Sequence, residues 1–213
     1  MYLIFDKLSA TVVGGVVILM LFTIQSRIQS NTVESTIMYG VKKQTLNFAE
    51  VLERDLSNAG YLSVPGDAGI LSHSNVMSGT RVLTDSLEFW GSDKTGNRTR
   101  VRYLLQPTIV TRIDGEDTQL YRMDRYELVA GTWKPSGASM STLSDFRIDL
   151  LDSGNNGVIN RVDARRLRVR FENAVVSQRM IDGDGSDRGL YLNKLRWGIT
   201  LSPKGLSMQT FQS

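Results

Sequence analysis

The stretch LSATVVGGVVILMLFTI, which covers residues 8–24, determines how the rest of the chain is organised. It carries no charge, and an α-helix needs roughly 17 to 25 such residues to cross the hydrocarbon core of a bilayer. No proline interrupts the sequence from this run to Gly60, and glycine commonly ends a helix. We therefore predict one continuous helix from Met1 to Gly60.

The predicted helix changes character along its length. Residues 1–26 are predominantly apolar and form the anchor, whereas residues 27–60 form an amphipathic spine helix. In the spine helix, apolar and small residues recur at intervals of three and four, which places them on one side. That side comprises Val41, Thr45, Phe48, Leu52, Leu56 and Ala59. We expect this stripe to lie against a sheet formed by residues 61–213.

A cleaved secretory signal and a buried core helix are the alternatives for the anchor. A signal needs a basic start and a small-residue cleavage site, whereas Asp6 and Lys7 balance each other and residues 23–27 continue into more helix. A core helix is seldom apolar on every face over this length. Both comparisons favour an anchor that packs in a membrane or in a protein assembly.

Composition limits the remaining possibilities. The residues after Gly60 number roughly 150, which is enough for one ordinary domain with its own core. Lys and Arg total 25 against 22 Asp and Glu, and this small excess argues against nucleic acid as a partner. The lack of cysteine excludes disulfides and thiolate metal sites, and a single histidine, His73, excludes a histidine-rich metal site.

The part of the chain that follows the helix has the pattern of a sheet domain. Residues 61–81 are rich in Ser, Gly, Asn and Asp and are predicted to form a long loop. Apolar residues then alternate with polar ones on both sides of three turns, at residues 92–97, 114–117 and 152–157, and again in a last strand at 195–201. The expected fold class is therefore α+β, with the long helix packed on one face of an antiparallel sheet whose other face is polar.

Motifs for catalysis do not occur in this sequence. It contains no nucleotide-binding loop, nucleophile elbow, zinc-protease motif or Cys-x-x-Cys, so we expect neither an enzyme nor a small-molecule substrate. The acidic stretch 182–187 offers one candidate calcium site, through Asp182, Asp184 and Asp187, because calcium prefers several carboxylate oxygens from a tight turn. It departs from the EF-hand pattern, and a solvated turn without a cofactor is the alternative.

A second candidate surface lies on one predicted strand. Arg166, Arg168 and Arg170 alternate with apolar residues and are expected to point away from the core. They would form either a stripe for docking a partner or the ordinary charged face of a half-buried strand.

Several short motifs recur in a recognisable order. The helix end ERDLSNAGY at residues 53–61 is followed by LEFWG at 87–91, RVRY at 100–103, QLYR at 119–122, LSDFRI at 143–148 and RRLRVRF at 165–171. In these motifs and their order, the chain resembles the type IV pilin-like proteins, specifically the minor pilin or J-type minor pseudopilin group, whose helix ends in RDLxxAGY. The resemblance implies an N-terminal helix packed in a filament or membrane, a sheet domain outside, and assembly rather than catalysis.

The start of the chain departs from that family. Its members carry a short basic leader that ends in Gly, cut before a Phe or Met that is followed four residues later by Glu. Here no Gly precedes the apolar run, and Phe5 stands at the position of the glutamate if Met1 is the mature start, with Asp6 one place later. Either the start is an atypical processed end, or the protein keeps its anchor without processing.

We expect this protein to be a structural subunit of a pilus-like or secretion-associated envelope assembly. Its partners would be other pilin-like subunits or copies of itself, in the inner membrane with the sheet domain outside the cytoplasm, or in an extracellular filament. A membrane-anchored structural protein of another assembly, such as a virion or a surface complex, is the alternative. The residues expected to serve assembly are Asp6, Lys7, Gly14 and Gly15: the carboxylate would pair with a cation at the membrane edge, and the glycines would let another helix approach.

Overall fold

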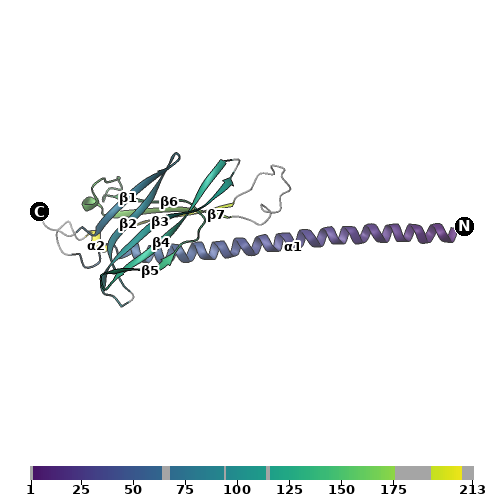
Figure 1. The fold of residues 1–213 in the computed structure, drawn as a ribbon, viewed down its shortest axis with the longest axis horizontal. Coiled ribbons are helices and arrows are strands. Elements are labelled where there is room, and N and C mark those ends of the chain that lie inside the picture. Colours follow the sequence, from purple (N-terminus) through teal and green to yellow (C-terminus); the bar gives the residue numbers. More distant parts are fainter. Residues whose placement is uncertain (1, 64–67, 94, 114–115, 176–192, 208–213) are drawn as a thin grey trace. The chain divides into compact units, whose positions relative to one another are not determined.

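A computed structural model describes residues 2–63, 68–93, 95–113, 116–175 and 193–207. The first element, α1, is a continuous helix over Tyr2–Ser57, as the sequence predicts. The chain divides into two compact units, Met1–Val41 and Lys42–Ser213, and α1 contributes to both. The second unit contains every strand of the described residues and the C-terminal part of α1 (Figure 1).

The strands form one antiparallel sheet of eight strands with the order β1-β2-β3-β4-β6-β7-β8, and β5 also pairs with β4. The elements after α1 are β1 (Ile70–Ser78), β2 (Arg81–Ser92), β3 (Arg98–Ile113), β4 (Glu116–Val129), β5 (Thr132–Ala138), β6 (Leu143–Leu151), the 3-10 helix η1 (Arg161–Asp163), β7 (Arg166–Val175), β8 (Asn193–Leu201) and the short helix α2 (Lys204–Ser207). The α+β fold class is therefore confirmed at the level of a long helix and an antiparallel sheet.

The three predicted hairpins and the last strand are present as β2–β3, β3–β4, β6–β7 and β8. The prediction of a loop over residues 61–81 is wrong, because β1 occupies Ile70–Ser78 and pairs with β2. Its Ser and Asn residues suggested a loop, but β1 lies at the edge of the sheet, where exposed polar side chains are normal.

The core lies between the C-terminal part of α1 and one face of the sheet. Phe48, Leu52 and Leu56 are buried there, as the predicted stripe requires. The ring of Phe48 meets the ring of Phe171 edge-on with centroids 5.4 Å apart. Thr45 is the polar member of the stripe, and its hydroxyl oxygen accepts a hydrogen bond of 2.8 Å from the amide of Asn173. Burial of this stripe therefore holds residues 45–56 of α1 on the sheet.

The edge of β6 that faces β4 is largely covered by side chains. β4 and β6 pair in register only at Tyr121 and Leu143. Further along β6, the Thr84 hydroxyl accepts a hydrogen bond from the Ile148 N–H at 2.8 Å, and His73 Nε2 lies 3.0 Å from the Ile148 carbonyl oxygen. Since a carbonyl only accepts, Nε2 carries the proton. Side chains from β1 and β2 thus satisfy backbone groups that a neighbouring strand would otherwise pair.

The end of α1 is fixed by a close contact between glycines. Gly60 has φ of 77°, in the left-handed region predicted for the residue that ends the helix, and its N–H donates to the Trp90 carbonyl at 2.7 Å. A Cβ atom on Gly205 in α2 would overlap the carbonyl oxygen of Gly60. Leu206, the next residue, is buried in the core. The glycines therefore let α2 dock directly on the end of α1.

Candidate assembly surfaces

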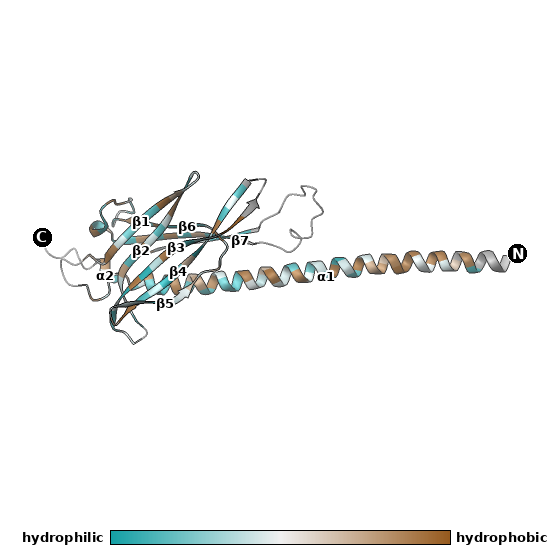
Figure 2. Ribbon diagram, viewed as in Figure 1, coloured by the Kyte–Doolittle hydropathy of each residue, from teal (hydrophilic) through white to brown (hydrophobic). Residues whose placement is uncertain are grey.

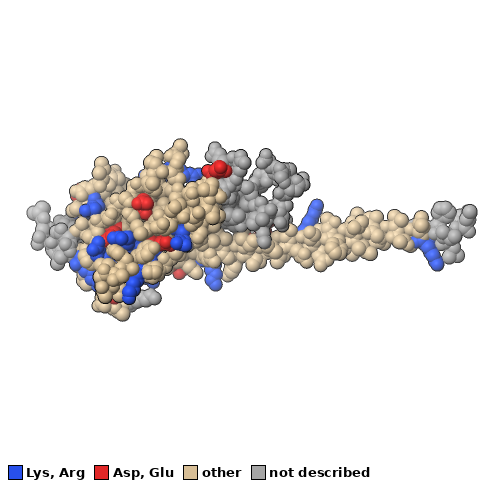
Figure 3. Space-filling model, viewed as in Figure 1, with Lys and Arg blue, Asp and Glu red and all other residues tan. Residues whose placement is uncertain are grey.

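The N-terminal unit exposes apolar side chains on every side of α1. Its large exposed apolar residues are Leu8, Val12, Val13, Val16, Val17, Ile18, Leu19, Met20, Leu21, Phe22 and Ile24. Brown predominates along this part of α1 in Figure 2, the face seen in Figure 3 shows no charged side chain there, and residues 8–24 contain no Asp, Glu, Lys or Arg. By length and composition, α1 contains a segment that can cross a membrane, and none of that segment is buried by the chain itself.

Two threonines inside the apolar band form their side-chain hydrogen bonds within the helix. The hydroxyls of Thr11 and Thr23 each donate a hydrogen bond of 2.9 Å to the carbonyl oxygen four residues earlier. Such bonds let threonine lie in lipid or against another helix without water. A Cβ added at Gly14 or Gly15 would have no atom within 4 Å. The helix backbone is therefore accessible at these two adjacent positions, where another helix could approach closely.

Of the predicted assembly residues, Lys7, Gly14 and Gly15 are exposed on α1. Asp6 is also in the helix, but its side chain lies outside the part of the chain that the structure describes. A role for these four residues in assembly stays a prediction.

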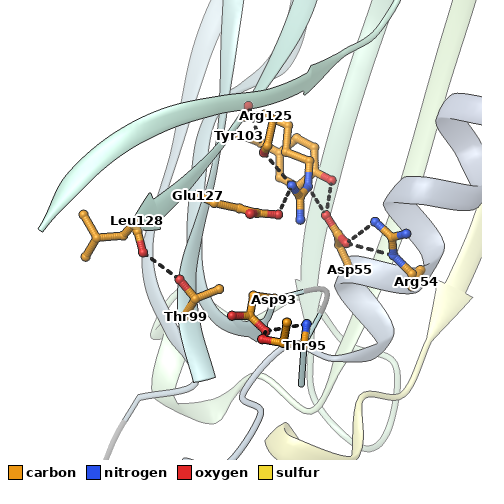
Figure 4. Close-up of polar contacts among 10 residues, drawn as sticks. Arg54, Asp55, Asp93, Thr95, Thr99, Tyr103, Arg125, Glu127 and Leu128 are labelled. Carbon is orange, nitrogen blue, oxygen red and sulfur yellow. Dashed lines mark hydrogen bonds and ion pairs between the residues drawn. The ribbon is translucent and has the colours of Figure 1, made fainter. Parts of the chain in front are cut away.

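A buried polar network holds the C-terminal part of α1 to the sheet (Figure 4). Asp55 Oδ2 accepts a hydrogen bond of 2.7 Å from the Tyr103 hydroxyl and another from Arg125 Nε. The Arg125 Nη1 donates to Glu127 and, at 2.5 Å, to the hydroxyl of Ser136. Both Asp55 and Arg125 have side chains only 5% exposed. Removing either partner would leave a charge buried without its main counter-ion.

Burial and neighbouring charges shift the pKa values of Arg125 and Tyr103 in this network. Burial would lower the pKa of Arg125, but its hydrogen bond to Asp55 and the charge of that carboxylate outweigh this effect and raise the pKa. Burial and the charge of Asp55 raise the pKa of Tyr103 well above its ordinary value. Neither group titrates near neutral pH. The arrangement therefore acts as a structural clamp and is poorly suited to proton transfer.

The opposite face of the sheet carries arginines stacked on tryptophans. The guanidinium carbon of Arg98 lies 4.0 Å from the centre of the Trp90 ring, and that of Arg102 lies 4.0 Å from the Trp133 ring. Beneath them, the nearly buried carboxylate of Glu88 accepts hydrogen bonds from both Arg100 and Arg102. Figure 3 shows Lys and Arg side chains gathered on the sheet domain with acidic ones among them. Salt bridges and cation–π contacts fix these side chains on the polar face.

The predicted arginine stripe on β7 makes contacts within the domain. Arg170 Nη2 donates to Asp149 at 2.7 Å, and Arg166 Nη1 donates to the side chain of Asn155 at 2.9 Å. These contacts fit the interpretation of this stripe as the ordinary charged face of a half-buried strand. Docking of a partner there stays a prediction.

The candidate calcium residues Asp182, Asp184 and Asp187 lie outside the described residues. Within the described ranges, no group of three or more His, Asp or Glu side chains is placed to hold a metal. His73, predicted in a loop, instead lies in β1 and contacts the β6 backbone. Burial lowers its pKa, although the Ile148 carbonyl and the charge of Asp149 oppose that shift.

Comparison with known proteins gives no family. No protein-family model, curated protein or solved structure matches this chain.

Proposed function

We propose that this protein is a non-catalytic structural subunit of a membrane-associated, pilus-like or secretion-associated assembly. One observation carries the proposal: residues 8–24 of α1 expose large apolar side chains all round the helix. Water strongly disfavours so much contiguous apolar surface, so the segment requires lipid, other helices, or both around it.

The construction of α1 supports a role in anchoring. The same uninterrupted helix provides the apolar band and, through Phe48, Leu52 and Leu56, part of the core of the second unit. The Asp55 network adds a second attachment of the helix to the sheet. A helix fixed in this way can hold a folded domain at a membrane or filament surface.

The resemblance to pilin-like proteins supports the more specific proposal. Two residues of the motif at positions 53–61 have clear structural roles: Asp55 accepts the buried hydrogen bonds, and Gly60 adopts positive φ under α2. A motif that ends a spine helix and locks it to a sheet fits a protein built on the pilin plan. In this proposal the sheet domain lies outside the cytoplasm, and the partners are other pilin-like subunits or further copies of the chain.

Images of the native assembly test the proposal. A C-terminally tagged protein is purified from the membranes of its source in mild detergent and examined by negative-stain electron microscopy. The proposal expects thin filaments or short filament tips that contain the chain. A shell or isolated anchored complexes would instead support the alternative of a virion or surface-complex protein. Recovery of the chain as a monomer in the soluble fraction, when the membranes are separated before detergent is added, would refute both.

A further inference from the structure

A pocket of about 460 Å³ lies within the second unit between α1 and the end of β5. Its lining combines apolar and polar groups. Phe48, Val51 and Met140 supply apolar walls, while Gln44 and Asn47 of α1 supply exposed amides at the rim. A volume of this size suits a few side chains of a peptide or one small molecule.

Arg125 gives the pocket a buried hydrogen-bond donor. Its Nε and Nη1 are occupied by Asp55, Glu127 and Ser136, whereas Nη2 has no hydrogen-bond partner among the described residues. Arg125 lines the pocket, and its unpaired Nη2 is accessible to solvent. Two N–H groups of a pocket-lining side chain that is 95% buried therefore have no partner among the described residues.

The strand beside the pocket has an unpaired edge. β5 pairs with β4, and no described strand pairs with its other side. Pro135 lacks an N–H and so weakens the first half of this edge as a template for pairing. Ser136, Gly137 and Ala138 follow it, are exposed, and also line the pocket. The pocket and the usable part of the edge therefore coincide.

Charge determines which acceptor fits. The network contains two carboxylates, Asp55 and Glu127, and two guanidinium groups, Arg125 and Arg54, so it is already neutral. An added carboxylate would lie close to both acids and be repelled, whereas a neutral carbonyl oxygen would not. A peptide backbone offers such carbonyls together with the donors and acceptors that an unpaired strand edge can bind.

We propose that this pocket binds an extended peptide segment of a partner protein. The segment pairs with β5 over residues 136–138, presents a main-chain carbonyl to Arg125 Nη2, and inserts an apolar side chain beside Phe48, Val51 and Met140. That the segment belongs to a partner subunit rests on the proposed function, but the binding itself does not. Failure of peptide binding would leave the proposed function intact, and failure of the proposed function would remove only the assignment of the segment to a partner subunit.

Peptide binding is measured on the full chain in detergent micelles, with 15N labels on its backbone and arginine side chains. The probe is the capped pentapeptide acetyl-TVLVT-amide, and NMR follows Arg125 and the amides of residues 136–139. We expect saturable shifts at these groups with a dissociation constant no weaker than about 1 mM. The proline-containing peptide acetyl-TPLPT-amide, which cannot form a strand ladder, is expected to bind at least about tenfold more weakly.

Filling the pocket provides the matched control. Val51→Trp, or Gln44→Trp if the first variant disturbs the fold, should weaken binding of the peptide at least about tenfold. Leu46→Trp introduces the same ring on an exposed position of α1 that does not line the pocket, and it should leave binding within about twofold. The proposal is overturned if no saturable shift occurs at Arg125, or if both peptides bind equally. It is also overturned if N-acetyl-leucine, a small carboxylate, binds as well as the pentapeptide.

Discussion

Asp55→Asn is the substitution that most directly tests the clamp between α1 and the sheet. In the folded protein the Asp55 carboxylate accepts hydrogen bonds from Tyr103 and Arg125, and all three side chains are buried. The amide of asparagine is uncharged and replaces one acceptor with a donor. Arg125 would then keep only Glu127 as a carboxylate partner.

Two estimates of the energetic cost agree. Removing one partner of a buried ion pair typically destabilises a protein by about 3 to 5 kcal/mol. Hydrogen bonds to a charged group contribute about 1.5 to 3 kcal/mol each, and Asp55 accepts two such bonds from buried donors. We therefore expect Asp55→Asn to lower the free energy of unfolding by about 3 to 5 kcal/mol.

Urea unfolding of the unit Lys42–Ser213, followed by tryptophan fluorescence, measures this loss. Glu50→Gln is the control, since it removes an exposed acid from the same helix and should change stability by less than about 0.5 kcal/mol. Tyr103→Phe, combined with Asp55→Asn in a double-mutant cycle, should give a coupling energy above about 0.5 kcal/mol. A loss below about 1 kcal/mol for Asp55→Asn would refute the clamp.

Four other predictions concern separate parts of the chain. Leu52→Ala should lower unfolding free energy by about 2 to 5 kcal/mol, because the side chain is fully buried, and a loss under about 0.5 kcal/mol would contradict this packing. Gly205→Ala should lower the free energy of unfolding by about 1 to 3 kcal/mol, because the new Cβ meets the Gly60 carbonyl. An unchanged urea midpoint would disprove that contact. Folding lowers the pKa of His73, so the unfolded state binds its proton first and the free energy of unfolding should fall as pH drops below about 6.5. His73→Gln should abolish this part of the pH dependence. Identical pH profiles for the variant and the wild type would exclude the histidine as its source. Asp6→Ala should reduce the amount of assembled material while the second unit unfolds as in the wild type, and normal assembly would show that Asp6 only marks the membrane edge.

The sequence predicts the parts of this fold that follow a strong local pattern. The stripe through Phe48, Leu52 and Leu56 has clear helical spacing, and strands with alternating residues such as Val101 and Tyr103 are equally clear. The sequence does not reveal β1, because β1 is a polar edge strand. It does not reveal β5 either, because β5 contains Pro135 and Gly137, which are unfavourable inside strands but tolerated at an edge.

The clamp could be predicted only in part. Asp55 lies within the apolar stripe, between Leu52 and Leu56, and an acid at such a position needs a buried partner. Its partner, Arg125, is 70 residues away. The register that pairs Tyr103 with Arg125 brings both side chains to the carboxylate, and that register depends on a long hairpin. No local spacing in the sequence reveals it, and the same holds for the pocket beside β5.

Cysteine cross-linking along the anchor tests the central claim most directly. The chain has no cysteine of its own, so single cysteines introduced from Leu8 to Ile24 report only on that segment. After mild oxidation of native membranes, the proposal predicts disulfide-linked products, to copies of the chain or to partner subunits carrying matching cysteines. Their yield should vary along the helix with a period of three to four residues, as expected for helices packed together. If no position gives a cross-linked product while the protein is membrane-bound, the anchor contacts only lipid and the subunit does not assemble through it.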